Sequence, residues 1–435
     1  MRNRLRKLYK HDTIKARIDT EEHGTDYTER TGVRMKAFHF HSPTEVVFGP
    51  GQEMNAGKMI TKWGGTRVLL HYGGESARRS GLLDRIEGVL KADGIPYVTL
   101  GGAQPNPRLS LVYEGIRICR ENRLDFILAV GGGSVIDSAK AMSVGLGHPD
   151  EDVWDFYLGK TVLRCAPVGV VLTIAAAGSE TSNSSVITKV DEDGTHIKRS
   201  IDQDIIRPKF AIMDPELIAT LPKYQIGCGV ADIMMHTLER YFSAAETLGN
   251  DLTDRIAVSV LKIMIQYGPK YLAEPSDYKA ASEVMWAGSL SHNNLTGCGN
   301  GGDFATHLIG HELSARYDAA HGATLTAVWG AWARYVMKAN VLRFAQYAVN
   351  VWGCDLDSVN PENTALAGIE RTERFFASIG MPVCMPDLIP QGVGEQDIQE
   401  MADLCVGLGR GMIGGFMRLG REDVVKIYRA ANEKK

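Results

Sequence analysis

Three histidines occur close together in the segment Asp303–Gly322. They are His307, His311 and His321, in a chain of 435 residues that has only twelve histidines. Neutral imidazole is the commonest metal ligand in proteins, and residues four apart on a helix lie on the same face. The spacing of His307 and His311 therefore predicts that both could reach one metal ion.

A second pair of potential ligands has the same four-residue spacing. Asp232 and His236 stand in Gly-Val-Ala-Asp-Ile-Met-Met-His-Thr. One carboxylate with two or three imidazoles suits a divalent first-row metal that keeps an open coordination position. A single histidine is more often a structural residue, but two such pairs in one chain favour a metal centre.

Spacing alone leaves the choice among the three histidines open. If residues 303–321 formed one straight helix, His321 would lie roughly 21 Å along the axis from His307, too far to share an ion. Either His307 acts with His311, or the chain breaks before His321. The run Arg-Tyr-Asp-Ala-Ala-His-Gly could supply that break, with Gly322 suited to a turn.

Composition excludes several classes of protein. Hydrophobic residues make up 44% and charged residues 23%, which is ordinary for a globular protein, and the length predicts two domains. A net charge of −4 gives no reason to expect nucleic acid or an anionic membrane as partner, and no apolar run reaches the ~18–20 residues of a membrane span. Seven scattered cysteines predict reduced thiols and a cytoplasmic protein.

The pattern of apolar residues changes twice along the chain. Residues 1–34 are basic at first and then acidic, and we expect a disordered extension. Residues 35–214 alternate strand and helix, which predicts an α/β dinucleotide-binding domain with a parallel sheet and right-handed crossovers. Residues 215–435 carry helical periodicity almost throughout, which predicts an all-α domain for the metal and the substrate.

The elements expected from these patterns can be given by residue number. In the first domain they are an extended hairpin at 38–48, strands at 67–72, 97–100, 126–130, from 171 and at 208–214, and helices over 78–93, 108–122 and from 134. In the second domain they are helices over 225–243, 252–271, 277–295, 303–315, 323–338, 341–352, 362–379, 395–408 and 421–433.

A glycine turn at 131–133 follows an apolar strand and precedes a helix. Glycines let the backbone approach a pyrophosphate, and a helix that starts at Ser134 offers free N–H groups and the positive end of its dipole. The alternative is a tight strand-to-helix turn without a ligand. Lys198 and Arg199 follow a polar turn at 191–194, where a solvated charged face is the alternative to a binding role.

Four motifs in order resemble those of the iron-containing (group III) alcohol dehydrogenases. They are Gly131-Gly-Gly-Ser-x-x-Asp137-x-x-Lys140, Ala177-Gly-Ser-Glu180, Asp232-x-x-x-His236 and His307-x-x-x-His311-x9-His321-Gly. The resemblance runs from about residue 36 to the C-terminus and is greatest to the NADPH-dependent butanol dehydrogenase and aldehyde reductase branch. It implies a Rossmann-like N-terminal domain and a helical C-terminal domain, as in dehydroquinate synthase, with cofactor and metal in the cleft between them.

The resemblance also implies a role for each matching residue. The metal ligands would be Asp232, His236, His307 and His321, which requires the chain break, and the ion would be Fe²⁺ or Zn²⁺. His311 would be a catalytic residue beside the metal that relays a proton. The implied cofactor-binding residues are Gly74, Ser76, Gly132, Gly133, Ser134, Asp137, Thr173, Ser179 and Lys198.

The choice between NADPH and NADH depends on the segment after the first strand. An acidic residue there would bind the adenosine ribose hydroxyls and repel a 2′-phosphate. Where NAD-using relatives carry that acid this chain has Gly74, and Ser76 with Arg78 or Arg79 could bind the phosphate. Glu75 opposes this preference, so NADPH is expected and NADH remains possible.

These features predict a metal-dependent enzyme that transfers hydride between NAD(P)H and a short-chain aldehyde or primary alcohol, and that forms a homodimer. A lyase or cyclase of the dehydroquinate synthase type is the alternative. It would need many lysines and arginines around an acidic substrate, whereas residues 285–330 include Trp286, Phe304, Leu308 and Leu313. A binding protein that had kept only the fold would be expected to have lost part of the ligand set.

Overall fold

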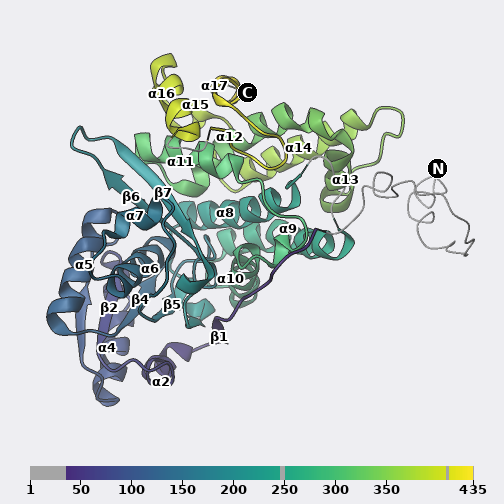
Figure 1. Ribbon diagram of the computed structural model, residues 1–435. Helices are drawn as coiled ribbons and strands as arrows, with labels where there is room; N and C mark the ends of the chain where they lie inside the picture. The colour runs from purple at the N-terminus through teal and green to yellow at the C-terminus, as the bar shows by residue number, and fades with distance from the viewer. Residues whose placement is uncertain (1–35, 245–249, 408–410, 435) are drawn as a thin grey trace, which may run out of the picture. The chain divides into compact units, whose positions relative to one another are not determined.

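The computed structural model describes residues 36–434 except 245–249 and 408–410. The extension expected over residues 1–34 lies outside the described residues. Figure 1 follows the chain from the sheet, through a hairpin, into the helical part.

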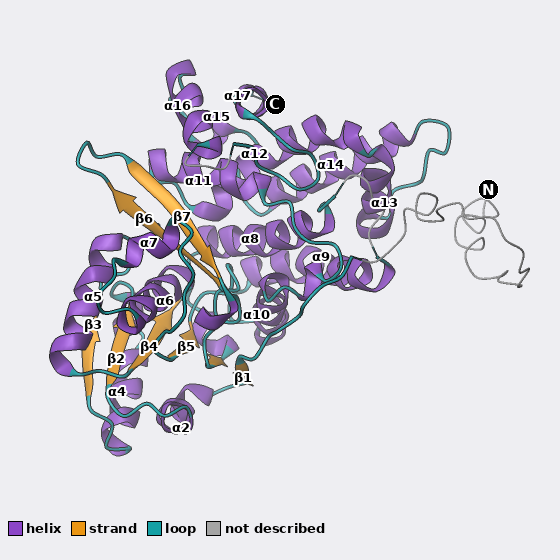
Figure 2. Ribbon diagram, viewed as in Figure 1, coloured by secondary structure: helices purple, strands orange, loops and turns teal. Residues whose placement is uncertain are grey.

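A six-stranded sheet forms the first half of the described chain (Figure 2). Its strand order is β1-β8-β5-β4-β2-β3, and every neighbouring pair is parallel. The strands are β1 (Glu45–Phe48), β2 (Val68–Tyr72), β3 (Tyr97–Leu100), β4 (Phe126–Gly131), β5 (Val168–Leu172) and β8 (Phe210–Met213). The central strands β4 and β5 are buried along their whole length, as parallel strands covered on both faces must be.

Helices cover both faces of this sheet. On one face, Leu70 and Leu128 pack with residues of α2 and α4; on the other, Leu69 and Ile127 pack with α5 and α6. The helices and turns of this half are η2 (Gln52–Asn55), α2 (Ala56–Lys62), α3 (Ser76–Arg79), α4 (Leu82–Ala92), α5 (Leu109–Asn122), α6 (Gly133–Gly147), α7 (Val153–Tyr157), η3 (Asp204–Ile206) and η4 (Pro215–Ile218). The α/β fold class with a parallel sheet is confirmed.

Three expectations for this half were wrong. The extended hairpin at 38–48 does not form, because β1 pairs in parallel with β8 and residues 36–44 contain no strand. The helix expected over 78–93 is divided into α3 and α4 at Gly81, whose φ of 73° interrupts the helical path. An antiparallel hairpin, β6 (Ser184–Val190) with β7 (His196–Asp202), was not expected at all.

The hairpin has a simple origin in the sequence. The two strands pair along their whole length, and the turn around Gly194 (φ 84°) joins them. Because the strands are rich in polar residues, only the turn was recognised from the sequence. In Figure 2 the hairpin projects from the sheet region towards α11 of the helical part, and β7 contacts that helix.

Helices form the second half. They are α8 (Lys223–Tyr241), α9 (Asp251–Ala273), α10 (Tyr278–His292), η5 (Leu295–Gly297), α11 (Ala305–Tyr317), α12 (His321–Val336), η6 (Met337–Ala339), α13 (Val341–Trp352), α14 (Pro361–Ser378), α15 (Met385–Leu388), α16 (Glu395–Val406) and α17 (Arg421–Ala431). The nine helices expected here from apolar periodicity are confirmed within a few residues at each end. None of the helices in the described residues is long and apolar enough to cross a membrane.

Helix α8 is the centre of this half. Its side chains are buried almost continuously from Gly229 to Tyr241, and it packs against α9, α10 and α12. A helix buried on all sides can direct polar side chains only at other buried polar groups. The site described next depends on this property.

Candidate metal and cofactor site

Asp232 lies at the centre of a group of imidazoles. Its Oδ1 is 3.4 Å from Nδ1 of His236, 3.6 Å from Nε2 of His307 and 3.7 Å from Nε2 of His321. Asp232 and His236 come from successive turns of α8, His307 from α11 and His321 from α12. The first pair predicted from the sequence, Asp232 with His236, therefore meets His307 of the second pair and His321 at one carboxylate oxygen.

The chain break before His321 is confirmed. Helix α11 ends at Tyr317, Asp318 takes a left-handed conformation with φ of 49°, and α12 begins at His321. The change of direction returns the ring of His321 to 5.3 Å from that of His307. The straight helix that would separate them does not exist.

Gly322 has a different role from the turn expected. It lies inside α12 and has no positive φ, but a Cβ at this position would overlap the backbone carbonyl of Cys228 in α8. The missing side chain allows the first turn of α12 to pack directly on α8. This close contact carries His321 to Asp232.

Four buried polar atoms of this group have no hydrogen-bond partner. They are Oδ1 of Asp232, Nδ1 of His236, Nε2 of His307 and Nδ1 of His321. The first three of these atoms converge, whereas the atom of His321 that faces Asp232 is Nε2. Buried polar atoms nearly always have partners, so the three convergent atoms indicate a site for a bound ion. One ligand atom each from Asp232, His236 and His307 fits within 4.8 Å, and one carboxylate with three imidazoles suits Fe²⁺ or Zn²⁺. The residues present fit a divalent metal ion.

Burial and neighbouring charges set the protonation of these imidazoles. Burial, followed by the neighbouring histidines, lowers the pKa of His236 well below its usual value, and burial with Lys198 does the same for His321. Burial also lowers the pKa of His307, but Glu239 and Asp232 outweigh it and raise the pKa to about 9. His236 and His321 are therefore neutral, which is the form that binds metals.

His311 lies beside this group. Its side chain is buried, and its ring is 5.1 Å from that of His321 and 6.2 Å from that of His307. It is one helical turn from His307, as expected. The geometry therefore gives His311 a position next to the cluster.

Glu239 was not among the residues predicted from sequence. It follows Asp232 and His236 on the same face of α8 and is fully buried. Its Oε2 contacts Nδ1 of His307, and its Oε1 accepts a hydrogen bond of 3.0 Å from the His307 backbone N–H. The spacing of seven residues from Asp232 could have shown that these three side chains share a face.

The glycine turn lies at the carboxyl edge of the sheet, between β4 and α6. A Cβ on Gly132 would lie 2.8 Å from Ile174, which would have to move, and one on Gly133 would make a tight contact of 3.0 Å with Ala177. Helix α6 begins at Gly133, with Ser134 in its first turn, and the Thr173 N–H donates to the Gly131 carbonyl over 3.1 Å. This edge is where parallel sheets bind nucleotides.

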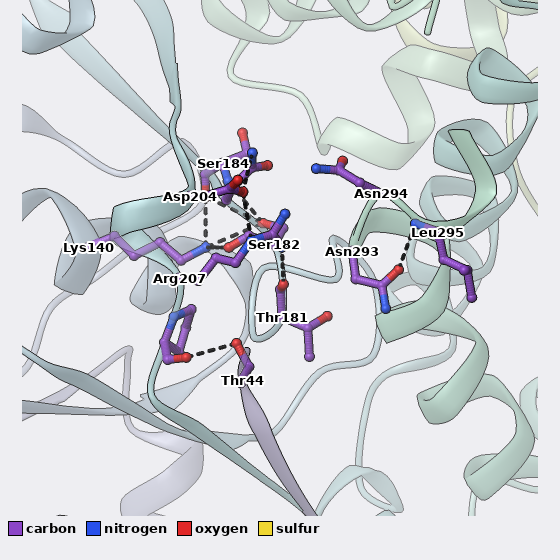
Figure 3. Close-up of polar contacts among 12 residues, drawn as sticks. Thr44, Lys140, Thr181, Ser182, Ser184, Asp204, Arg207, Asn293, Asn294 and Leu295 are labelled. Atoms are coloured by element: carbon purple, nitrogen blue, oxygen red, sulfur yellow. Dashed lines mark hydrogen bonds and ion pairs between the residues drawn. The ribbon is translucent and has the colours of Figure 1, made fainter. Parts of the chain in front are cut away.

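Lys140 joins this turn to the segment that follows β5 (Figure 3). Its buried ammonium donates to the carbonyls of Ser179 at 2.7 Å, Ser182 at 3.0 Å and Ser184 at 2.7 Å. The Ser179 hydroxyl donates to Asp137 over 2.6 Å. Lys140 therefore holds residues 179–184 against α6 through hydrogen bonds to their backbone carbonyls.

Asp137 therefore already has protein partners. Its second oxygen accepts a 3.0 Å hydrogen bond from the Val186 backbone N–H. Both Asp137 and Ser179 were predicted to contact the cofactor. The structure places them together beside the glycine turn, where they tie α6 to β6.

Lys198 and Arg199 do not form a solvated face. Both lie on β7 with about 5% of their surface exposed, and Lys198 donates to Oδ1 of Asn106 over 3.1 Å. Burial lowers the pKa of Lys198 to about 8, against the opposing charges of Asp137 and Asp232. The Asn106 oxygen that accepts from Lys198 also accepts from the Ser314 hydroxyl of α11 over 3.0 Å, which places the end of Lys198 next to the helix that carries His307.

Gly74 lies in the exposed loop after β2, at the same edge of the sheet, and Ser76 is the first residue of the short helix α3 that follows. A side chain at Gly74 would meet no atom within 4 Å. Nearby, Arg78 donates to the Tyr72 hydroxyl over 3.1 Å. The loop is open and carries the cationic groups expected from the sequence.

Comparisons with known proteins extend these observations. Residues 43–215 match the family described as iron-containing alcohol dehydrogenase, and residues 227–432 match its C-terminal part. The chain belongs to the iron-containing alcohol dehydrogenase family.

Individual relatives agree along nearly the whole chain. An NADH-dependent butanol dehydrogenase A of Clostridium acetobutylicum is 38% identical over 91% of this chain and 99% of its own length. An NADPH-dependent aldehyde reductase of Escherichia coli is 34% identical over 81% of this chain and 89% of its own. The crystal structure of an NADH-dependent butanol dehydrogenase A from Thermotoga maritima has a TM-score of 0.86 at 34% identity, covering 92% of this chain and 99% of that one.

Membership of this family gives the general activity. The protein is an oxidoreductase that acts on alcohols or aldehydes with a nicotinamide cofactor, and the family uses a divalent metal. The alternative of a lyase or cyclase is not favoured, because the relatives are dehydrogenases and reductases.

Proposed function

We propose that the chain interconverts short-chain aldehydes and primary alcohols at a metal centre held by Asp232, His236, His307 and His321. The observation that carries this proposal is the convergence of three buried ligand atoms without hydrogen-bond partners, from Asp232, His236 and His307, with Nε2 of His321 3.7 Å from the same carboxylate oxygen. A divalent ion bound there would act as a Lewis acid on the oxygen of the substrate. The donor set suits Fe²⁺ or Zn²⁺ equally.

The glycine turn would bind the nicotinamide cofactor. The free N–H groups at the start of α6, from Gly133 and Ser134, would bind the pyrophosphate, which Gly132 lets approach the backbone. Thr173 and Ser179 would line the cofactor's path, and Asp137 would lie near its nicotinamide end. Support comes from the contacts that hold these residues at one edge of the sheet.

Lys198 would contact the cofactor ribose or its phosphate. Its contact with Asn106, which also contacts α11, supports this role, because the cofactor must reach the helices that carry the metal ligands to deliver hydride near the metal. The ammonium would also stabilise the negative charge that develops on the carbonyl oxygen when hydride is added to the carbonyl carbon.

His311 is proposed to relay the proton that the reduced substrate needs. A ring 5.1 Å from that of His321 lies close to the oxygen that the substrate would present to the metal. The relay would carry a proton from water to that oxygen in reduction, and in the opposite direction in oxidation.

The substrate is proposed to be small and apolar. Phe304 and Leu308 are half-buried on the first turns of α11, and the Phe304 ring lies 5.7 Å from that of His307. Such side chains favour an alkyl chain over a phosphorylated or acidic substrate. The relatives named butanol dehydrogenase support the same substrate class.

NADPH is proposed as the preferred cofactor. Gly74 leaves no acid to repel a 2′-phosphate, and Ser76, Arg78 and Arg79 stand in the exposed loop and helix beside it. Relatives of both cofactor classes are similar to this chain, so the preference is argued from these residues alone.

Two further proposals concern the cell. Seven free cysteines, none of them in a disulfide, support a cytoplasmic location. Phe48, the last residue of the edge strand β1, and Trp286 of α10 are exposed and in contact with each other. An exposed aromatic pair beside an edge strand supports assembly as a homodimer.

The test of the proposed function is the rate of NADPH oxidation with butanal. It should be measured before and after a chelator and again after Fe²⁺ or Zn²⁺ is restored, with NADH in parallel. We expect loss of turnover on chelation, recovery with either metal, and a higher kcat/KM with NADPH. Turnover that does not respond to metal removal would contradict the site.

A further inference from the structure

Glu239 is a carboxylate with both oxygens directed at one residue. It is fully buried, and its Oε1 and Oε2 contact the backbone N–H and the ring Nδ1 of His307. Within the described residues it forms no ion pair with a lysine or an arginine. Burying a carboxylate is costly unless its partners are well placed, so its presence here calls for a specific reason.

The same residue also holds the start of α11 through its backbone. The Glu239 carbonyl accepts a 2.8 Å hydrogen bond from the Asp303 N–H. Asp303 in turn accepts hydrogen bonds from the N–H groups of Ala305, Gly415 and Phe416 at 2.8–2.9 Å. Glu239 therefore connects α8, which bears Asp232 and His236, to α11, which bears His307, at three points.

The contact with Nδ1 determines which nitrogen of His307 can bind an ion. A carboxylate can only accept a hydrogen bond, so Nδ1 of His307 must carry the proton. In the neutral imidazole, the form that binds a cation, the lone pair then belongs to Nε2, which is the buried atom without a hydrogen-bond partner 3.6 Å from Oδ1 of Asp232. One residue thus sets both the tautomer and the orientation of this imidazole.

We infer that Glu239 is a positioning residue of the metal site, which holds His307 with Nε2 directed at Asp232 and fixes α11 against α8. The inference rests on the proposed metal site and extends it to a residue outside the ligand set. The carboxylate also increases the electron density on the imidazole, which strengthens its bond to a cation. Glu239 itself touches neither the substrate nor the cofactor in this account.

The decisive variant is Glu239→Gln. It keeps the size of the side chain, but the amide has a single acceptor oxygen, and its NH₂ group faces the second donor of His307. Glu239→Asp keeps the charge at a shorter reach and is the conservative variant. Asp254→Asn is the matched control, because it changes another buried carboxylate, one that pairs with Arg343 on α9 and α13 rather than with the histidines.

The readouts are the Kd for Co²⁺ and Zn²⁺ of metal-free protein, the visible absorption of the Co²⁺ form, the Kd for NADPH and the Tm. For Glu239→Gln we expect a 10- to 100-fold weaker metal affinity and an altered Co²⁺ spectrum with an unchanged Kd for NADPH. Glu239→Asp should recover part of the affinity. Asp254→Asn should lower the Tm while leaving metal affinity as in the wild type.

Three results would overturn the inference. One is a folded Glu239→Gln protein with wild-type metal affinity and Co²⁺ spectrum. Another is an equal loss of affinity in Asp254→Asn, which would make the effect one of general stability. The third is a wild-type protein that binds neither Co²⁺ nor Zn²⁺. This result would contradict the proposed metal site itself, whereas the first two would contradict only the role of Glu239.

Discussion

Oδ1 of Asp232 lies within 4 Å of three imidazoles, which belong to three different helices. Oδ1 of this carboxylate has no hydrogen-bond partner although it is buried. Because the negative charge would neutralise a bound cation and the three rings would complete its coordination, its removal should affect binding more than the loss of one imidazole.

Asp232→Ala should abolish metal loading. We expect less than about a tenth of the wild-type metal content and a fall in turnover of at least about 100-fold, since the Lewis acid would be lost. NADPH affinity should remain within about twofold. Metal analysis of the purified protein with a binding titration checks this, and His39→Ala, at an exposed histidine outside the site, is the control.

Lys198 predicts a pH dependence of stability. Burial lowers its pKa to about 8 in the folded protein, against 10.5 for an ordinary lysine. Between these values the unfolded chain binds more protons, so the contribution of Lys198 to stability rises with pH and is constant below about 8. Over this window the slope from one group approaches about 1.4 kcal/mol per pH unit.

Lys198→Met removes this titrating group. The free energy of unfolding of the variant minus that of the wild type should therefore fall steadily from pH 8 to 10.5. Urea unfolding of both proteins at pH 7.5, 9 and 10 measures the difference. Parallel pH profiles would show that the lysine is not desolvated as the structure has it.

At the scale of elements, the site depends on how closely α12 approaches α8. Gly322 permits this approach, because any side chain there would overlap the Cys228 carbonyl. Gly322→Ala should push the two helices apart, lower stability by about 1–3 kcal/mol through overpacking and weaken metal binding by displacing His321. Thermal unfolding and metal titration measure the two effects.

Gly88→Ala is the control for this substitution. Gly88 lies inside α4, and a Cβ there would meet no atom within 4 Å. Alanine should stabilise this helix by about 1 kcal/mol and leave metal affinity unchanged. If both alanine variants behave alike, close packing at Gly322 is not what places His321.

The loop between β2 and α3 predicts an effect on cofactor choice. Glu75 is exposed there between Gly74 and Ser76, where its charge would oppose a 2′-phosphate. Glu75→Gly should raise the ratio of kcat/KM for NADPH over NADH about fivefold, which is the ~1 kcal/mol expected for one exposed charge pair in water. The ratio is compared in Glu45→Gln, which removes a carboxylate from β1 instead. An unchanged kcat/KM ratio in the Glu75→Gly protein would mean that the 2′-phosphate of NADPH does not bind near this loop.

At the scale of the whole molecule, a bound ion would join α8 to the consecutive helices α11 and α12, which lie far from it in sequence. Asp232 and His236 belong to α8, His307 to α11 and His321 to α12. Because the unfolded chain has no such site, binding stabilises the folded state by about 2.7 kcal/mol at a metal concentration 100 times the Kd.

Chelation should therefore lower the Tm of the wild type by several degrees. Calorimetry with and without a chelator measures this shift. The Asp232→Ala variant should show none, because it has no ion to lose. A shift of equal size in that variant would mean that the chelator acts at another place.

Much of the architecture follows from local sequence pattern. The apolar runs of β2, β4 and β5 and the helical periodicity from α8 to α17 are each set by residues within one element. When one face of an element is buried, its apolar residues recur every two residues in a strand and every 3.6 residues in a helix, and this repeat is visible in the sequence. For the same reason β6 and β7 were missed, because their polar residues are buried by contacts that arise only when the hairpin packs on α6 and α11.

Within the site, sequence determined which residue types could bind a metal and a pyrophosphate, since ligand chemistry belongs to the side chain itself. Only the tertiary structure decided that His321 joins Asp232, that Lys198 is buried, and that Glu239 contacts His307. These depend on the reversal at Asp318 and on the contact of Gly322 with Cys228. Such contacts join segments far apart in the chain, and no local periodicity specifies which buried faces will meet.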